Sequence, residues 1–182
     1  MAEKDILSNL SLQTPSQTVG PYFAYGLTPE QYLYDFKSLR SNELISPLDA
    51  NAITLSGNVF DGQNQIIPDA MIELWQQDSR GQYWGRFGTG TLDKNKFLFH
   101  IHTPEIIENQ APYISVIIFM RGQLIHSYTR IYFEDFSDWN EKDEVFQSAG
   151  ERKSTLIARK TSKGYEFNIY MQGENETVFF DV

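Results

Sequence analysis

The strongest constraint on the fold is a series of short apolar segments that begins at Ile53 and is interrupted by turn residues. Residues 53–60, Ile-Thr-Leu-Ser-Gly-Asn-Val-Phe, alternate in polarity and stop at Asp61-Gly62, a strong turn dipeptide. Because successive side chains of a strand point to opposite faces, this alternation predicts a strand with one buried face. The 13 phenylalanines and 10 tyrosines add to the preference for strands over helices.

Six further segments continue this pattern along the chain. They are residues 70–77, 97–102, 113–120, 123–133, 155–160 and 165–171. Turn signals separate them, among them Thr103-Pro104, Arg121-Gly122 and Lys163-Gly164. Residues 78–90 are predicted to form a polar, glycine-rich loop, and within it residues 85–90, Gly-Arg-Phe-Gly-Thr-Gly, lack the order of a phosphate-binding loop and are followed by no helix. Short strands with regular turns predict an all-β fold, an antiparallel β-sandwich.

The length of 182 residues suits a single domain. We expect an N-terminal arm over residues 1–50, the sandwich over residues 51–171 and an ordered C-terminal tail over residues 172–182. Within the arm, residues 29–40 are expected to form a short helix or an ordered extended segment. Residues 137–148 have the charge density of a surface helix or turn. The tail ends on Val-Phe-Phe-Asp-Val, so we expect it to pack against its own domain or a partner.

The composition excludes several classes of protein. A net charge of −9 with scattered basic residues argues against a surface that binds nucleic-acid phosphates. The chain has no cysteine, which excludes a disulfide framework and a thiolate metal site and makes a cytoplasmic location the default expectation. No apolar run approaches the ~20 residues that span a bilayer, and the first residues lack the pattern of a signal peptide.

Residues 14–23, Thr-Pro-Ser-Gln-Thr-Val-Gly-Pro-Tyr-Phe, form a stiff segment outside any strong helix or strand pattern. Pro15 and Pro21 fix their own φ angles and favour an extended conformation in the residue before each of them. Gly20 has no Cβ, so other atoms can approach the backbone closely there. This segment is predicted to form the lip of a pocket or of a subunit seam; the alternative is an arm docked on its own domain.

His100 and His102 are the obvious candidates for metal ligands. Side chains at i and i+2 of a strand share a face, so both imidazoles could converge on one ion. A site would need a third and preferably a fourth ligand, and nothing in the sequence places His126, the remaining histidine, opposite the pair. We therefore favour two strand histidines on a polar or half-buried face and assign no metal ligand to this chain.

Arg121 is the candidate for binding an anion. It follows an apolar strand and precedes Gly122, which permits unusual backbone angles. A guanidinium there could bind a carboxylate through two parallel hydrogen bonds, although a solvated turn arginine is the commoner outcome. No serine has the context of a nucleophile elbow, so no catalytic residue is assigned. Trp75 is predicted to be a core aromatic residue.

Seven sequence landmarks run in a fixed order along nearly the whole chain. They are residues 14–22, 57–62, 72–76, 111–112, 121–122, 129–133 and 172–181. In content and order they resemble the α subunits of protocatechuate 3,4-dioxygenases, within the family of intradiol ring-cleaving dioxygenases. The first and last landmarks, Thr-Pro-Ser-Gln-Thr-Val-Gly-Pro-Tyr and Gln-Gly-Glu-Asn-Glu-Thr-Val-Phe-Phe-Asp, are long enough to be specific.

The resemblance implies the intradiol cleavage of protocatechuate by O₂ to 3-carboxy-cis,cis-muconate. In the family, two tyrosines and two histidines hold Fe(III), a cation for which hard oxygen donors are chemically suitable. This set belongs to the catalytic β subunit. The implied arrangement is therefore a hetero-oligomer of αβ pairs, in which the partner β subunit holds Fe(III) and this chain binds none.

The family's ligand positions can be compared with this sequence one by one. Tyr83 occupies the position of the first tyrosine ligand. Residues 103–110, where the second tyrosine is expected, contain no tyrosine, and residues 113–115, Tyr-Ile-Ser, replace the two histidines. His100 and His102 lie one strand too early to substitute for them. One position of four is typical of the non-catalytic α subunit.

The same resemblance implies a role for this chain in the substrate pocket, which forms at the seam between α and β. Thr18, Gly20, Pro21 and Tyr22 are implied to form its N-terminal lip, and Arg121 to reach toward the substrate. Two alternatives remain open. One is a binding or structural β-sandwich that works without a β partner, and the other is a self-sufficient metalloprotein that uses the three histidines.

Overall fold

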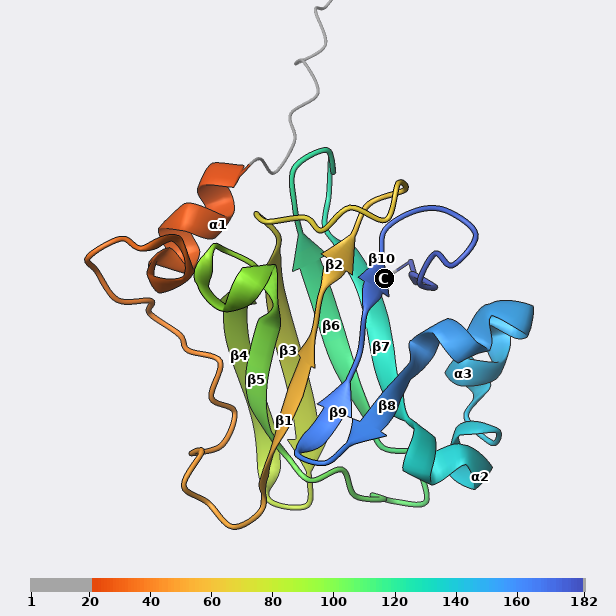
Figure 1. Cartoon of the computed structure of the whole chain (residues 1–182). Helices are drawn as coiled ribbons and strands as arrows, with labels where there is room; N and C mark the ends of the chain where they lie inside the picture. The colour runs from red at the N-terminus through yellow and green to blue at the C-terminus, as the bar shows by residue number, and fades with distance from the viewer. Residues whose placement is uncertain (1–20, 182) are drawn as a thin grey trace, which may run out of the picture.

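The computed structural model describes residues 21–181, and only the backbone of residues 21–23, 92 and 93 (Figure 1). The strands are β1 Ala52–Gly57, β2 Val59–Phe60, β3 Met71–Asp78, β4 Gly81–Gly88, β5 Phe97–His102, β6 Tyr113–Phe119, β7 Ser127–Phe133, β8 Ile157–Thr161, β9 Gly164–Glu166 and β10 Ile169–Tyr170. The helices are α1 Pro21–Leu27, α2 Ser137–Asn140 and α3 Glu144–Ser148, with 3₁₀ turns η1 Pro29–Tyr32, η2 Leu92–Asn95, η3 Glu134–Phe136 and η4 Gly150–Leu156.

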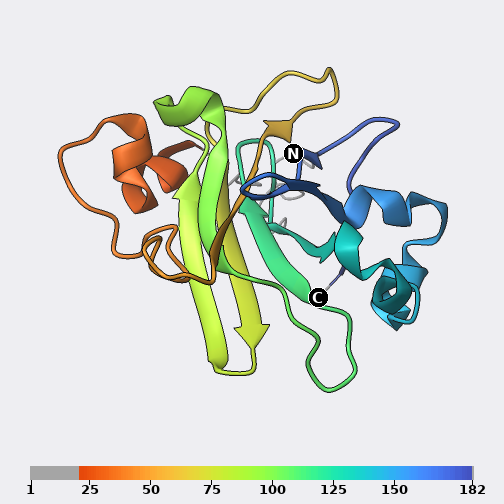
Figure 2. The same ribbon diagram turned by 60° about the horizontal axis from the view of Figure 1, so that its bottom comes forward.

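Eight strands form one sheet in the order β4-β3-β6-β7-β8-β9-β1-β5, and β10 pairs with β2. The sheet curls so that β4, β3, β6 and β7 form one layer and β9, β1 and β5 the other (Figures 1 and 2). The predicted all-β sandwich is confirmed. The pairs β1–β9, β7–β8 and β2–β10 run parallel, whereas the other pairs of the described chain are antiparallel. Alternation along a strand indicates its buried face but not the direction of its neighbour, so these parallel pairs were not predicted.

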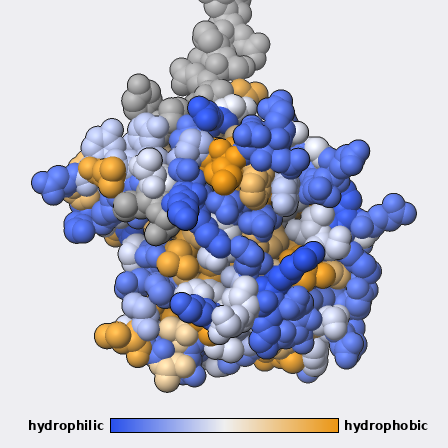
Figure 3. Space-filling model, in the orientation of Figure 1, coloured by the Kyte–Doolittle hydropathy of each residue, from blue (hydrophilic) through white to orange (hydrophobic). Residues whose placement is uncertain are grey.

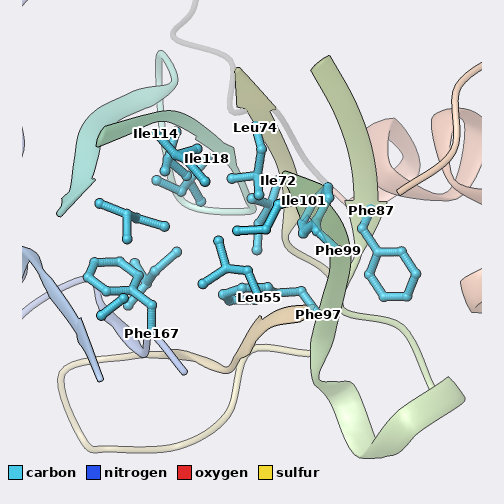
Figure 4. Packing of buried hydrophobic residues seen from close by; sticks show 14 of the residues in the cluster. Leu55, Ile72, Leu74, Phe87, Phe97, Phe99, Ile101, Ile114, Ile118 and Phe167 are labelled. Carbon is cyan, nitrogen blue, oxygen red and sulfur yellow. The ribbon is translucent and has the colours of Figure 1, made fainter. Parts of the chain in front are cut away.

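The core lies between the two layers. Strand β6, predicted from its apolar sequence, alternates strictly between buried and half-buried side chains. Figure 4 shows inward side chains of β1, β3, β5 and β6 meeting in one apolar cluster. Fully buried members of the cluster include Leu55, Ile72, Leu74, Phe97, Phe99, Ile101, Ile114, Val116 and Ile118. Each such side chain contributes about 1.5–3 kcal/mol by its transfer from water, which makes the sandwich a rigid support for the loops at its ends.

The segment between η1 and β1 pairs with both edges of the curled sheet. The carbonyl oxygen of Ser41 accepts a hydrogen bond from the backbone N–H of Arg86 on β4, at 2.9 Å. The carbonyl oxygen of Asn42 accepts one from His100 on β5, at 3.0 Å. Unpaired strand edges invite association, so this segment satisfies backbone groups that the sheet order leaves open.

The loop predicted over residues 78–90 is wrong for most of its length, because residues 81–88 form strand β4. The glycines mark close packing rather than a turn. A Cβ on Gly85 would lie 2.9 Å from the carbonyl oxygen of Ser41, and one on Gly88 would overlap the side chain of Thr28. Glycine within a strand often marks such a close approach of another segment.

The extended conformation predicted for residues 14–23 is wrong from Pro21 onward, since helix α1 begins there. Proline is favoured at the first position of a helix, where its missing N–H has no partner to lose. In residues 29–40, the 3₁₀ turn η1 is followed by irregular chain. Helices α2 and α3 lie within residues 137–148, as the charge density predicts.

The C-terminal tail packs on its own domain. Thr129 Oγ1 donates a hydrogen bond of 2.6 Å to the carbonyl oxygen of Val178, and the N–H of Phe180 donates one of 2.8 Å to the carbonyl oxygen of Tyr128.

Figure 3 shows the face over β1, β5 and β9 as largely hydrophilic with scattered apolar patches. No helix within residues 21–181 is long and apolar enough to cross a membrane.

Candidate functional site

Arg121 lies in the loop that joins β6 to β7, and its side chain is 59% exposed. Its Nε lies 3.3 Å from Oδ1 of Asp69, a carboxylate that is only 4% exposed. Within residues 21–181, Asp69 is the only acidic side chain that forms an ion pair with Arg121. The guanidinium is therefore held from one side by a buried acid, while most of its surface is open to an anion.

Asp69 and Tyr32 are two polar side chains that interact electrostatically near Arg121. Burial raises the pKa of Asp69, and the charge of Arg121 only partly opposes this rise. Burial and the charge of Asp69 both raise the pKa of Tyr32. Neither Asp69 Oδ1 nor the Tyr32 hydroxyl has a hydrogen-bond partner among the described residues. A carboxylate buried in this way costs free energy, so Arg121 supplies its main compensation.

The predicted lip residues lie outside the described residues or at their limit. Thr18 and Gly20 are not described, and Pro21 and Tyr22 are described only as the backbone that begins α1. A chain of contacts connects α1 to Arg121, because the ring of Tyr25 lies 4.4 Å from that of Tyr32, centroid to centroid. Helix α1 and the β6–β7 loop therefore lie at the same end of the sandwich (Figure 1).

A pocket of about 220 Å³ lies at the opposite end of the same layer. It is lined by the ends of β3, β4 and β6 and by the loop between β5 and β6, which projects beyond the strands in Figure 2. Arg121 is not among the lining residues. Strand β6 separates the two regions, and its seven residues span about 20 Å. Arg121 therefore cannot serve this pocket.

A buried charged cluster lies beside that pocket. His102 is 4% exposed, and its Nδ1 lies 2.9 Å from Oδ2 of Asp78. Arg80 donates to the same Oδ2 at 2.6 Å and also contacts the imidazole, while the ring of Tyr83 lies 4.1 Å from that of His102, centroid to centroid. Burial works to raise the pKa of Asp78, but hydrogen bonds from Arg80 and the charges of His102 and Arg80 lower it. Asp78, Arg80 and His102 therefore pair with one another within the cluster.

The histidines do not combine into a metal site. His102 is turned to Asp78, and His126 is exposed in the β6–β7 loop beside Phe119. Within residues 21–181, no three histidine, aspartate or glutamate side chains gather closely enough to hold a metal ion. Tyr83, the one residue at a ligand position of the family, packs against His102 instead. The residues present in this chain therefore do not fit the family's ferric site.

The core position predicted for Trp75 is wrong. Its side chain is 43% exposed and stacks on Trp84 of the neighbouring strand, with 5.3 Å between centroids and 11° between planes. Leu74 and Gln76 on either side of it are buried, so Trp75 points to the outer face, and a polar residue such as Gln76 does not reveal its buried position in the sequence. The roles of Asp69 and Asp78 had no sequence signal either, because each depends on a partner from another strand or loop.

Comparisons with known proteins give a consistent result. No family model matches the chain. It is 42% identical to the protocatechuate 3,4-dioxygenase alpha chain of Burkholderia cepacia, over 93% of this chain and 98% of that protein. It is 34% identical to the corresponding alpha chain of Pseudomonas putida, over 93% and 96%. Among solved structures, the dioxygenase domain of a carbohydrate-binding fusion protein from a cellulolytic Streptomyces has the same fold, with a TM-score of 0.56 at 20% identity over 76% of this chain and 90% of that domain.

Proposed function

This chain belongs to the family of protocatechuate 3,4-dioxygenase α chains, and we propose that it is the accessory subunit of an enzyme that opens the ring of protocatechuate between its two hydroxyl groups. Both atoms of O₂ enter the product, 3-carboxy-cis,cis-muconate. The identity to two α chains over nearly their whole length supports this function. A cytoplasmic location stays a prediction from the cysteine-free composition.

The Fe(III) of the enzyme is proposed to lie in the partner β subunit, in a hetero-oligomer of αβ pairs. Two features of this chain support that assignment. Only Tyr83 stands at a ligand position of the family, and it packs on His102. His102 itself is committed to Asp78 and Arg80, so it is not available as a ligand without loss of the buried cluster.

Arg121 is proposed to bind the carboxylate of the substrate at the seam with the β subunit. The observation that carries this role is its position: an exposed guanidinium, oriented by buried Asp69, about 20 Å of strand away from the pocket of its own chain. Such a group is suited to a ligand held by a neighbouring chain. A desolvated Arg–carboxylate contact contributes about 2–5 kcal/mol when measured by truncation.

Thr18, Gly20, Pro21 and Tyr22 are proposed to complete the entrance of the same pocket. The contacts from Tyr25 through Tyr32 to Asp69 support this role, because they place the start of α1 at the end of the sandwich that carries Arg121. The backbone of a glycine next to a proline would allow a planar substrate to pass close to the lip.

Co-expression with a β subunit tests the proposal. The chain is purified alone and with a β partner, and bound iron and O₂ consumption with protocatechuate are measured in both samples. We expect iron and turnover only in the co-purified complex. Iron or turnover in the isolated chain would overturn the assignment of the metal to the partner, and failure to co-purify with any β chain would favour a β-sandwich that works without one.

A further inference from the structure

The pocket at the end of β3, β4 and β6 differs in chemistry from the region around Arg121. We call it the Trp75 pocket after the exposed aromatic residue in its wall. Its volume of about 220 Å³ is below the range of drug-sized sites and suits a small organic molecule. Trp75, Tyr83 and Tyr113 supply three aromatic side chains to its lining. The indole of Trp75 stacks on Trp84 and is 43% exposed, so a large apolar surface faces solvent here without a covering side chain from residues 21–181.

The charged groups of this lining are all acidic. Glu105 and Glu108 line the pocket, and none of the described lining residues is a lysine, arginine or histidine. A hydrogen bond from the backbone N–H of Ser79 lowers the pKa of Glu105, so this carboxylate is ionised at neutral pH. Glutamines and Ser115 supply the remaining polar groups, which are neutral.

Two basic residues lie near the pocket without lining it. Arg80 is bound to Asp78, and its charge also helps to lower the pKa of Glu105. Arg130 is the cross-strand partner of Ser115, with its guanidinium 4.1 Å from the ring centroid of Tyr113, so it flanks the pocket on the same face of the sheet without lining it. The pocket thus presents aromatic rings and two carboxylates to a ligand, the combination that binds organic ammonium ions.

We propose that the Trp75 pocket binds a small organic cation that carries an aromatic or methylated body, and that it rejects aromatic carboxylates. The ammonium group would lie toward Glu105 and Glu108, and the apolar body against Trp75. This site has the opposite charge preference to Arg121 and does not depend on the ring-cleaving function or on iron.

A ligand series of similar shape and different charge tests the proposal. Binding of benzylammonium, benzyl alcohol and benzoate to the full chain is measured by isothermal titration calorimetry at pH 7, with and without a co-purified β subunit. We expect benzylammonium to bind at least about tenfold more tightly than benzyl alcohol, and benzoate to bind most weakly. Equal or tighter binding of benzoate, or no binding of benzylammonium to either sample, would overturn the proposal.

Variants place the binding in this pocket. Glu105→Gln/Glu108→Gln is expected to weaken benzylammonium about tenfold and to leave benzyl alcohol unchanged, since glutamine keeps an acceptor for Ser79. Glu151→Gln/Glu174→Gln removes the same charge at exposed positions outside the pocket and is the matched control. Trp75→Ala is expected to weaken both ligands, with thermal unfolding as the check on its fold. If both double variants weaken benzylammonium equally, the binding reflects net charge and the site is disproved.

Discussion

Each end of the sandwich contains a buried aspartate, and the pKa values of these two aspartates, Asp78 and Asp69, are shifted in opposite directions. At the turn between β3 and β4, Asp78 is surrounded by Arg80, the imidazole of His102 and backbone N–H groups, and these lower its pKa. At the other end, Asp69 is equally buried but has only Arg121, at 3.3 Å, and burial raises its pKa. A fully partnered carboxylate stabilises the fold. A poorly partnered one holds a cation whose remaining surface is free for a ligand.

The largest expected effect is that of Arg121→Ala in the assembled enzyme. Loss of a desolvated contact with the substrate carboxylate is expected to lower kcat/KM for protocatechuate by about a hundredfold or more, at ~1.4 kcal/mol per decade. Oxygen consumption measures it. Arg159→Ala, an exposed arginine on β8, is the matched control and should change turnover little. Unchanged kinetics for the Arg121 variant would show that Arg121 does not bind the substrate carboxylate.

Asp78→Asn tests how much the cluster of Asp78, Arg80 and His102 contributes to stability. The substitution leaves Arg80 and His102 without their shared carboxylate, so the free energy of unfolding is expected to fall by about 2 kcal/mol. Urea unfolding of the chain measures this loss. A variant as stable as the parent would show that the cluster does not stabilise the fold.

Asp69→Asn is expected to affect substrate binding more than stability, in contrast to Asp78→Asn. The asparagine no longer holds Arg121 by charge, so KM for protocatechuate is expected to rise about tenfold while kcat changes little. Stability should change by less than for Asp78→Asn, because the lost ion pair is offset by the relief of a costly buried carboxylate.

Asp138→Asn on the exposed face of α2 is the control for that substitution. A large loss of stability with unchanged KM would mean that Asp69 supports the fold and does not position Arg121.

The smallest effect is on the pH dependence of stability. The lowered pKa of Asp78 means that its contribution is present above its ordinary value of 3.8 and is lost as pH falls through the folded-state pKa. The raised pKa of Asp69 has the opposite sign: its contribution is present below 3.8 and is lost as pH rises through the folded-state pKa.

Urea midpoints between pH 3 and 7 measure both contributions. Relative to the parent, Asp78→Asn should lose less stability on acidification, and Asp69→Asn should lose more. Parallel curves for the two variants would contradict the contrast between the two ends.

Much of the fold could be predicted from local patterns. The apolar run of residues 113–120 and the turn at Lys163-Gly164 correspond to strand β6 and to the β8–β9 hairpin of the structure. The family inferred from seven landmarks is confirmed by the relatives. Predictions failed where the structure of a residue depends on its neighbours in space: Gly85 belongs to a strand because it pairs with Leu74 of β3, and Trp75 is exposed because Leu74 and Gln76 fill the buried face.

The sequence by itself determined the all-β class and the family, because short apolar segments alternate with turns and the landmarks are contiguous in the chain. Only the tertiary structure decided which charged side chains pair with one another. Asp69 meets Arg121 because β3 and β6 are paired, and Asp78 meets His102 because the layer that contains β5 packs on the layer that contains β3. Electrostatic interactions fall off over a few ångströms, so their effect depends on that pairing and packing and cannot be found in any single segment.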